Sequence, residues 1–311
     1  MRTEMRMGRT TNRRKRRLPI GLGVAALLAA ALALTGCDGL PIHEATRTLT
    51  GSFAVTGAVD LDVWTTNGRV TVQGVDGQAT VEVTATIRSR GDTEFDAATR
   101  AAQVVVEMIH VGNHIELAYD AGAHPWDVRR YTGVEFEITV PTTADIEIDT
   151  SNGTVEAAAV TGILDLHTSN GAVDVSDVVG EAAVTTSNGT IRIDDSEAVL
   201  DLETSNGGIV LTDVDGIVDA RSSNGNISFA GTLLEGVDHS LVTSNGRIDV
   251  VLQVDASFWI VARTSNAAIT TNLPLTGDTE GREWNAAMNP PATGTVTLET
   301  SNGAISILGA L

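Results

Sequence analysis

Acidic side chains recur at a fixed spacing in the middle of this chain, and such rows are candidates for cation binding or acid–base chemistry. Asp177, Asp195 and Asp213 follow one another at intervals of 18 residues, with Asp194 and Asp215 nearby. Aligned carboxylates can bind Ca²⁺ or act as a general acid and a general base. These residues also fall among glycines, where Asp commonly stabilises turns through local hydrogen bonds, so we favour a structural role.

The remaining reactive side chains form no catalytic pattern. His110 and His114 could bind a metal only with partners that the sequence does not identify, and two exposed histidines are the simpler interpretation. The sequence contains no Gly-x-Ser-x-Gly nucleophile motif, no phosphate-binding loop and no Gly-Gly-x-Gly-x-Asp calcium repeat. We therefore predict no catalytic residue, no cofactor and no metal site.

The single cysteine, Cys37, lies at the end of an N-terminal targeting segment. Five basic residues, 13–17, precede an uncharged run rich in Ala and Leu at residues 20–34. This run has 15 residues, fewer than the roughly 20 that a membrane-spanning helix needs, and the pattern is typical of a signal peptide. Leu34-Thr35-Gly36-Cys37 resembles the lipobox of bacterial lipoproteins, which implies that the thiol receives a diacylglyceryl group and that Cys37 becomes the first mature residue.

Several expectations follow from this segment. Residues 1–36 would be a lipoprotein signal peptide and residues 37–48 a tether. A single cysteine cannot form an internal disulfide, which supports the lipid at Cys37. The pair Arg13-Arg14 leaves twin-arginine export open beside the general secretory route. We expect an exported, membrane-anchored protein on the outer side of the cytoplasmic membrane, or facing the periplasm in a cell with two membranes.

The charge balance excludes one class of partner. The whole chain has a net charge of −20, and removal of residues 1–36 leaves 12 basic and 39 acidic residues, a net charge of −27 with no lysine. Nucleic acids and anionic lipid headgroups are poor partners for such a surface. A salt-adapted host, cation binding and a solvated envelope surface all agree with this acidity, and we favour the last.

A Thr/Ser-Ser-Asn-Gly tetrapeptide recurs through the chain and sets its architecture. The regular copies contain Asn152, Asn170, Asn188, Asn206 and Asn224 at intervals of 18 residues, and the series continues at Asn245, Asn266 and Asn302. A repeat of this length is too small to bury its own apolar face, so we predict stacked rungs of one solenoid.

Each repeat contains two short segments in which apolar and polar residues alternate, as half-buried strands require. Val155, Val173 and Ile191 occupy one apolar position of successive repeats, and Leu164-Asp165-Leu166 belongs to the second segment. Asn-Gly also suits hairpin turns, but every copy has the same residue order, which favours parallel coiling over a meander. We expect the asparagines to point inward as a hydrogen-bonded ladder and the following glycines to adopt positive φ.

The irregular regions predict insertions. Residues 65–72 match the repeat and predict an early rung, and residues 92–110 predict one helix because their apolar residues recur at helical spacing. Strands are expected at 115–118 and 134–140. Residues 273–291 predict an inserted loop, which is either a binding site or a cap over the open end of the sheet.

With its lipobox and its Thr-Ser-Asn-Gly-x-Val/Ile-x-Val repeats, the chain resembles the bacterial putative-adhesin β-strand-repeat family, a domain of unknown function. The resemblance covers most of residues 50–311 and implies an all-β, parallel β-solenoid fold over residues 49–311, with no catalytic motif. Ala267 departs from the usual Gly. We expect a lipid-anchored, non-enzymatic adhesin or envelope-binding module whose ligand the sequence does not specify. The alternatives are an accessory lipoprotein for envelope-stress signalling and a carbohydrate-active β-helix enzyme.

Overall fold

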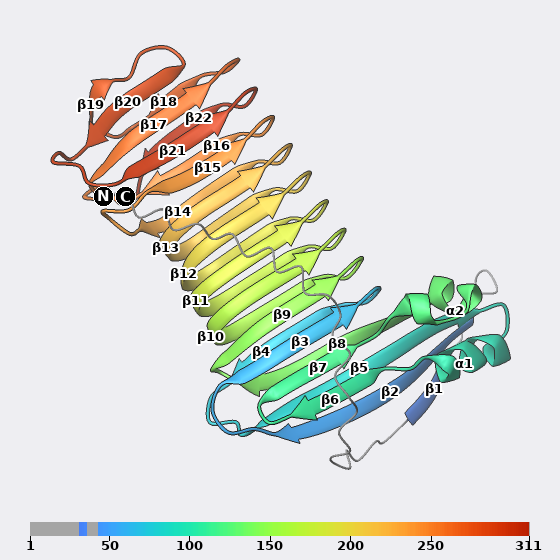
Figure 1. Cartoon of the computed structure of the whole chain (residues 1–311). Helices are drawn as coiled ribbons and strands as arrows, with labels where there is room; N and C mark the ends of the chain where they lie inside the picture. The colour runs from blue at the N-terminus through green and yellow to red at the C-terminus, as the bar shows by residue number, and fades with distance from the viewer. Residues whose placement is uncertain (1–30, 36–42, 311) are drawn as a thin grey trace.

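The computed structural model describes residues 31–35 and 43–310 and shows a long stack of parallel rungs with different structures at its two ends (Figure 1). The regular rungs are formed by β9 (Ala144–Thr150), β10 (Val155–Thr168), β11 (Val173–Thr186), β12 (Ile191–Thr204) and β13 (Ile209–Ser222). Val155 pairs with Val173 and Val173 with Ile191, an offset of one repeat each time. The predicted parallel β-solenoid is confirmed.

Each regular rung has two outer faces with the core between them. Within β10, Val155, Ala157, Leu164 and Leu166 are buried, whereas Asp165 between the two leucines points outward. The half of each rung that follows the Asn corner forms what we call the exit face. The half that leads into the next Asn corner forms the entry face. Side chains from both halves meet in one continuous apolar core that runs along the stack.

The first rung is formed by β3 (Val59–Thr65) and β4 (Val70–Val75), as residues 65–72 predicted. These strands pair in parallel with β9 and β10, although the paired residues, such as Val59 and Ala144, are 85 positions apart in sequence. The intervening chain supplies further strands at this end of the stack, which pair with one another in antiparallel orientation. They are β5 (Thr80–Gly91), β6 (Glu107–Val111), β7 (His114–Ala118) and β8 (Thr132–Pro141), and β2 (His43–Ala54) pairs with β5. The expected strands at 115–118 and 134–140 are therefore present.

The predicted helix is confirmed but is shorter than residues 92–110. Helix α1 covers Glu94–Gln103, and the Thr93 side chain caps it by accepting a hydrogen bond from the Asp96 amide. Ala97 and Ala101 form its buried face, and the chain then enters β6. A short 3-10 helix, η1 (Ala121–Ala123), and a second helix, α2 (Trp126–Tyr131), were not predicted. No helix in residues 31–35 and 43–310 has the length and apolar character needed to cross a membrane.

Strand β1 (Ala31–Thr35) pairs antiparallel with β2. It lies within the predicted signal peptide, so cleavage before Cys37 would remove it. Cys37 itself lies outside the residues that the structure describes, and so does most of the segment expected to be a signal peptide.

The order of rungs at the C-terminal end differs from their order in sequence. The strands are β14 (Ile227–Leu233), β15 (His239–Thr243), β16 (Ile248–Leu252), β17 (Phe258–Thr264), β18 (Ile269–Thr271), β19 (Leu275–Asp278), β20 (Glu283–Met288), β21 (Thr295–Thr300) and β22 (Ile305–Gly309). Strand β21 pairs with β15 on one side and with β17 on the other, and β22 lies between β16 and β18 in the same way. The last rung in sequence is therefore inserted inside the stack.

Candidate functional site

The repeated asparagines form one continuous row along the corner of the stack. From Asn152 onward, each Nδ2 donates to the Oδ1 of the asparagine one rung below, at 2.6–2.8 Å. The row runs in the order Asn67, Asn152, Asn170, Asn188, Asn206, Asn224, Asn245, Asn302 and Asn266. Asn67 extends the predicted row at one end, and Asn302 stands before Asn266 because of the inserted rung.

The prediction that these asparagines point inward is wrong. Asn152, Asn170 and Asn188 are exposed, whereas the Thr two positions earlier is buried in each repeat. In the rung of Thr186, its Oγ1 accepts a hydrogen bond from the Gly189 amide and donates to the Gly171 carbonyl of the rung below, both at 3.1 Å. The Thr hydroxyl therefore satisfies the buried backbone at the corner, and the Asn row lies outside it, in contact with solvent.

The glycine after each asparagine is required by close stacking and not, in the regular rungs, by positive φ. A Cβ added to Gly189 would lie 1.6 Å from the Gly171 carbonyl oxygen of the rung below. Gly189 is absent from the residues with positive φ, which corrects our expectation. Ala267 occupies this position in the terminal rung, which stacks on the rung of Asn302, and nothing in the structure explains why alanine stands there.

The acidic turn row is the first candidate site. Asp177, Asp195 and Asp213 adopt φ values of 53°, 48° and 50°, which places them in the left-handed turn conformation that Asp tolerates better than most residues. This agrees with a turn role. Together with Glu197 and Asp215 they line a shallow groove of about 340 Å³ along the turn edge. All charged residues of this groove are acidic, so it is a region of negative potential on three successive rungs.

A second candidate lies on the exit face, where an open hollow of about 540 Å³ extends from β4 to β13. Its lining includes small side chains such as Ala158 and Ser176, and Glu156 and Asp194 supply negative charge. Arg192 crosses it and contacts Asp174 on the neighbouring rung, with 3.2 Å between Nη1 and Oδ1. The hollow follows rigid paired strands, so its donors and acceptors are held at fixed spacing.

Three arginines contact carboxylates at separate places along the stack. Besides Arg192, Arg221 contacts Asp219 at 2.7 Å on the entry face, and Arg263 contacts Glu283 at 2.8 Å and Glu299 at 3.1 Å. These contacts lie on different rungs and on both faces. Each of these contacts neutralises neighbouring carboxylates locally, and the three arginines do not converge on one place in the described part of the chain.

Two carboxyl groups on the entry face have perturbed acidity. Partial burial raises the pKa of Asp165, and the negative charge of Asp149 raises it further against the opposing effect of His167. Partial burial likewise raises the pKa of Asp201, with Asp219 adding to the effect. In both cases burial, which disfavours the charged carboxylate, is the larger cause.

The two histidines considered as metal ligands lie apart. The His110 ring packs against Phe53, with 5.3 Å between ring centroids, and its Nε2 is 2.7 Å from the Gly112 carbonyl. His114 instead lies on the entry-face side, 2.9 Å from Asp60. We did not predict Asp60 and Asp62 as site residues. The available signal was the alternation in Val59-Asp60-Leu61-Asp62-Val63, which places both carboxylates on one side of a strand.

The expected loop at 273–291 is largely a β-hairpin. Strands β19 and β20 pair antiparallel, and β20 also pairs antiparallel with β17, the strand of the terminal rung. Trp284 and Met288 are buried against that rung. The hairpin therefore covers the edge of β17, as the cap interpretation expects, and this limits pairing with another chain.

Comparison with known proteins gives a family match and distant structural similarities. The family model described as Toastrack DUF4097 matches residues 75–308. No curated protein matches the chain significantly.

Three solved structures resemble this chain at low similarity. A putative adhesin from Parabacteroides distasonis ATCC 8503 is 13% identical, with a TM-score of 0.40 over 85% of this chain and 97% of its own. A putative adhesin from Bacteroides fragilis NCTC 9343 is 13% identical, with a TM-score of 0.35 over the same shares. A putative lipid binding protein from Parabacteroides distasonis ATCC 8503 is 11% identical, with a TM-score of 0.33 over 85% and 97%. Similarity at this level carries no inference about function.

Proposed function

This chain belongs to the Toastrack DUF4097 family, and we propose that it is a non-enzymatic binding module of the cell envelope, anchored to a membrane by a lipid on Cys37. The observation that carries the proposal is the rigid array of paired rungs with a continuous, charged outer surface. Such an array repeats the same spacing of polar groups over many rungs, which suits weak contacts made many times along an extended ligand.

We assign the ligand to the exit-face hollow. The small side chains in its lining admit a chain lying across the strands, and the charged groups of Glu156, Arg192 and Asp194 offer hydrogen bonds from several rungs. An open hollow of this kind suits an extended polar polymer, such as an envelope glycan, better than a small molecule, which needs a concave site that buries most of its surface.

The arrangement of charges favours binding over catalysis. A glycosidase requires two carboxyl groups on either side of the scissile bond, one of them a general acid. Asp165 and Asp201 have raised pKa values, but they lie on the entry face, and Ala183 of the intervening rung separates them. Arg192 is paired with Asp174 in the exit-face hollow, where its guanidinium can donate a hydrogen bond to a ligand oxygen.

The decisive experiment measures binding to an array of envelope glycans and peptidoglycan fragments. We compare the wild-type protein with Ser176→Trp, which fills the hollow. The matched control is Ala183→Trp, at an exposed position of the same strand on the opposite face. We expect saturable binding that Ser176→Trp abolishes and Ala183→Trp preserves. Binding that only Ala183→Trp disrupts would place the ligand on the entry face, and absence of binding throughout would refute the proposal.

The lipid anchor needs a separate test. In cells that process lipoproteins, the wild-type protein should fractionate with membranes and gain the mass of a diacylglyceryl group on its N-terminal peptide. The Cys37→Ser variant should lose both properties. A wild-type protein that is recovered without the lipid would refute the anchor but would leave the binding proposal intact.

A further inference from the structure

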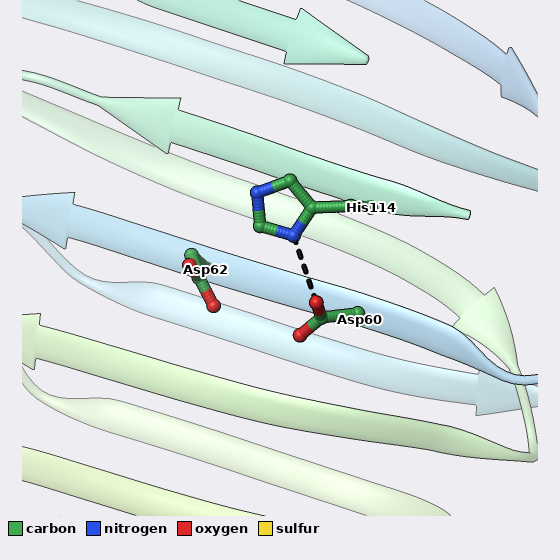
Figure 2. Close-up of side chains that lie close together, drawn as sticks. All are labelled: Asp60, Asp62 and His114. Atoms are coloured by element: carbon green, nitrogen blue, oxygen red, sulfur yellow. Dashed lines mark hydrogen bonds and ion pairs between the residues drawn. The ribbon is translucent and has the colours of Figure 1, made fainter. Parts of the chain in front are cut away.

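Three side chains that are distant in sequence meet on the entry-face side of the N-terminal rungs. Asp60 and Asp62 lie on β3, and His114 lies on β7, the strand that pairs with β3 in parallel. The register places Asp60 opposite His114. Figure 2 shows the His114 ring above β3, its contact with Asp60, and Asp62 beside them on the same strand.

The donor atoms of this cluster already lie close together. His114 Nδ1 is 2.9 Å from Asp60 Oδ2, and one ligand atom from each of the three residues lies within 4.8 Å of the others. Donors around a tetrahedral zinc ion are roughly 3.4 Å apart, given bonds of about 2.1 Å. His114 and Asp60 side chains are 32% and 65% exposed, so small rotamer adjustments can bring the set to that spacing without disturbing the core.

The neighbouring positions on both sides add negative charge. Across the pairs of β3 with β7 and β9, Asp62 stands opposite Glu116 and Glu147, and Asp60 stands opposite Asp145. Paired strands lie about 4.8 Å apart, so these carboxylates are close neighbours of the cluster. The His114 nitrogen thus lies in a region of negative potential that attracts cations. The presence of an imidazole distinguishes this cluster from the groove of the acidic turns, whose charged residues are all carboxylates.

We propose that Asp60, Asp62 and His114 form a binding site for a divalent transition-metal ion, with zinc as the best fit. The metal takes the place of the proton between His114 Nδ1 and Asp60, that proton passes to solvent, and water completes the coordination. A mixed set of one imidazole and two carboxylates favours zinc and similar ions over Ca²⁺, which prefers oxygen ligands alone. The site is separate from the exit-face hollow and does not rest on the proposed function.

The test is isothermal titration of Zn²⁺ into the full chain in detergent, prepared without a histidine tag and in a Cys37→Ser background, because that thiol could also bind zinc. We expect one high-affinity equivalent per chain. His114→Ala and Asp60→Asn should weaken it about tenfold or more.

His167→Ala is the matched control. His167 lies on the same acidic face, opposite Asp149, yet among the described residues only Asp60, Asp62 and His114 form a converging set. Zinc affinity should remain unchanged in this variant, and circular dichroism should show that all variants are folded. The proposal is overturned if the chain takes up no zinc or if His114→Ala binds zinc as tightly as the parent. It is also overturned if Ca²⁺ binds the site as tightly as Zn²⁺ does.

Discussion

Replacement of Thr186 by Val tests whether the buried hydroxyl, and not the exposed asparagine, holds each corner together. Val keeps the shape of Thr but removes the hydroxyl, so the Gly189 amide and the Gly171 carbonyl lose a partner in a buried environment. An unsatisfied buried polar group costs about 1–3 kcal/mol, so two such groups predict a loss of roughly 2–6 kcal/mol. Relaxation of the corner toward solvent would bring the loss to the lower end of this range.

Thr185→Val is the matched control for this experiment. Thr185 is the adjacent residue, but its side chain is exposed on the entry face. The control should change the unfolding free energy by less than about 0.5 kcal/mol. Denaturation followed by circular dichroism gives the overall effect, and hydrogen exchange of the Ile191 amide, which bonds to the Gly208 carbonyl, reports on the local rungs. Equal stability of the two variants, or a larger loss in Thr185→Val, would show that the corner argument is mistaken.

Three further predictions concern the corner and the core. Gly207→Ala should lower the unfolding free energy by about 3 kcal/mol or more, because the added Cβ would lie 1.6 Å from a carbonyl oxygen. Gly208→Ala, where that distance is 3.2 Å, should lower it far less. Equal melting temperatures of the two variants would contradict this prediction. Asn188→Ala should cost less than about 1 kcal/mol per lost amide bond, since that row is solvated, and a loss like that of a core cavity would restore the inward interpretation. Burial lowers the pKa of His239, so as the pH falls below 6.5 the unfolded chain binds a proton at this residue before the folded chain does. The unfolding free energy should therefore decline below pH 6.5, and it should decline less steeply in His239→Asn.

Much of the regular fold could be predicted because the repeat is local. Identical spacing of Val155, Val173 and Ile191 is sufficient to predict stacked parallel strands, and it does not depend on distant contacts. The direction of the asparagines could not be obtained in this way. Alternation along a strand is interrupted at a corner, so the parity of Asn188 relative to Ile191 does not determine which of Thr186 and Asn188 is buried.

The order of the C-terminal rungs could not be predicted from the sequence either. Asn245, Asn266 and Asn302 lie in nearly identical tetrapeptides, so no residue near them indicates which rung is whose neighbour. The candidate metal cluster could not be predicted from the sequence for a related reason. His114 meets Asp60 only because β7 pairs with β3 across the insertion that carries α1, and local patterns do not report such pairing.

The inserted C-terminal rung constrains how this protein can be made. During synthesis, β15 and β17 leave the ribosome before β21, yet they are not paired with each other in the finished stack, because β21 lies between them. The stack therefore cannot be completed in the order of translation. Until residues 295–309 are available, the terminal rung and its hairpin have no strand to join them to the rest of the solenoid. Completion of this end of the solenoid is thus a late, long-range step, slower than the stacking of the central rungs.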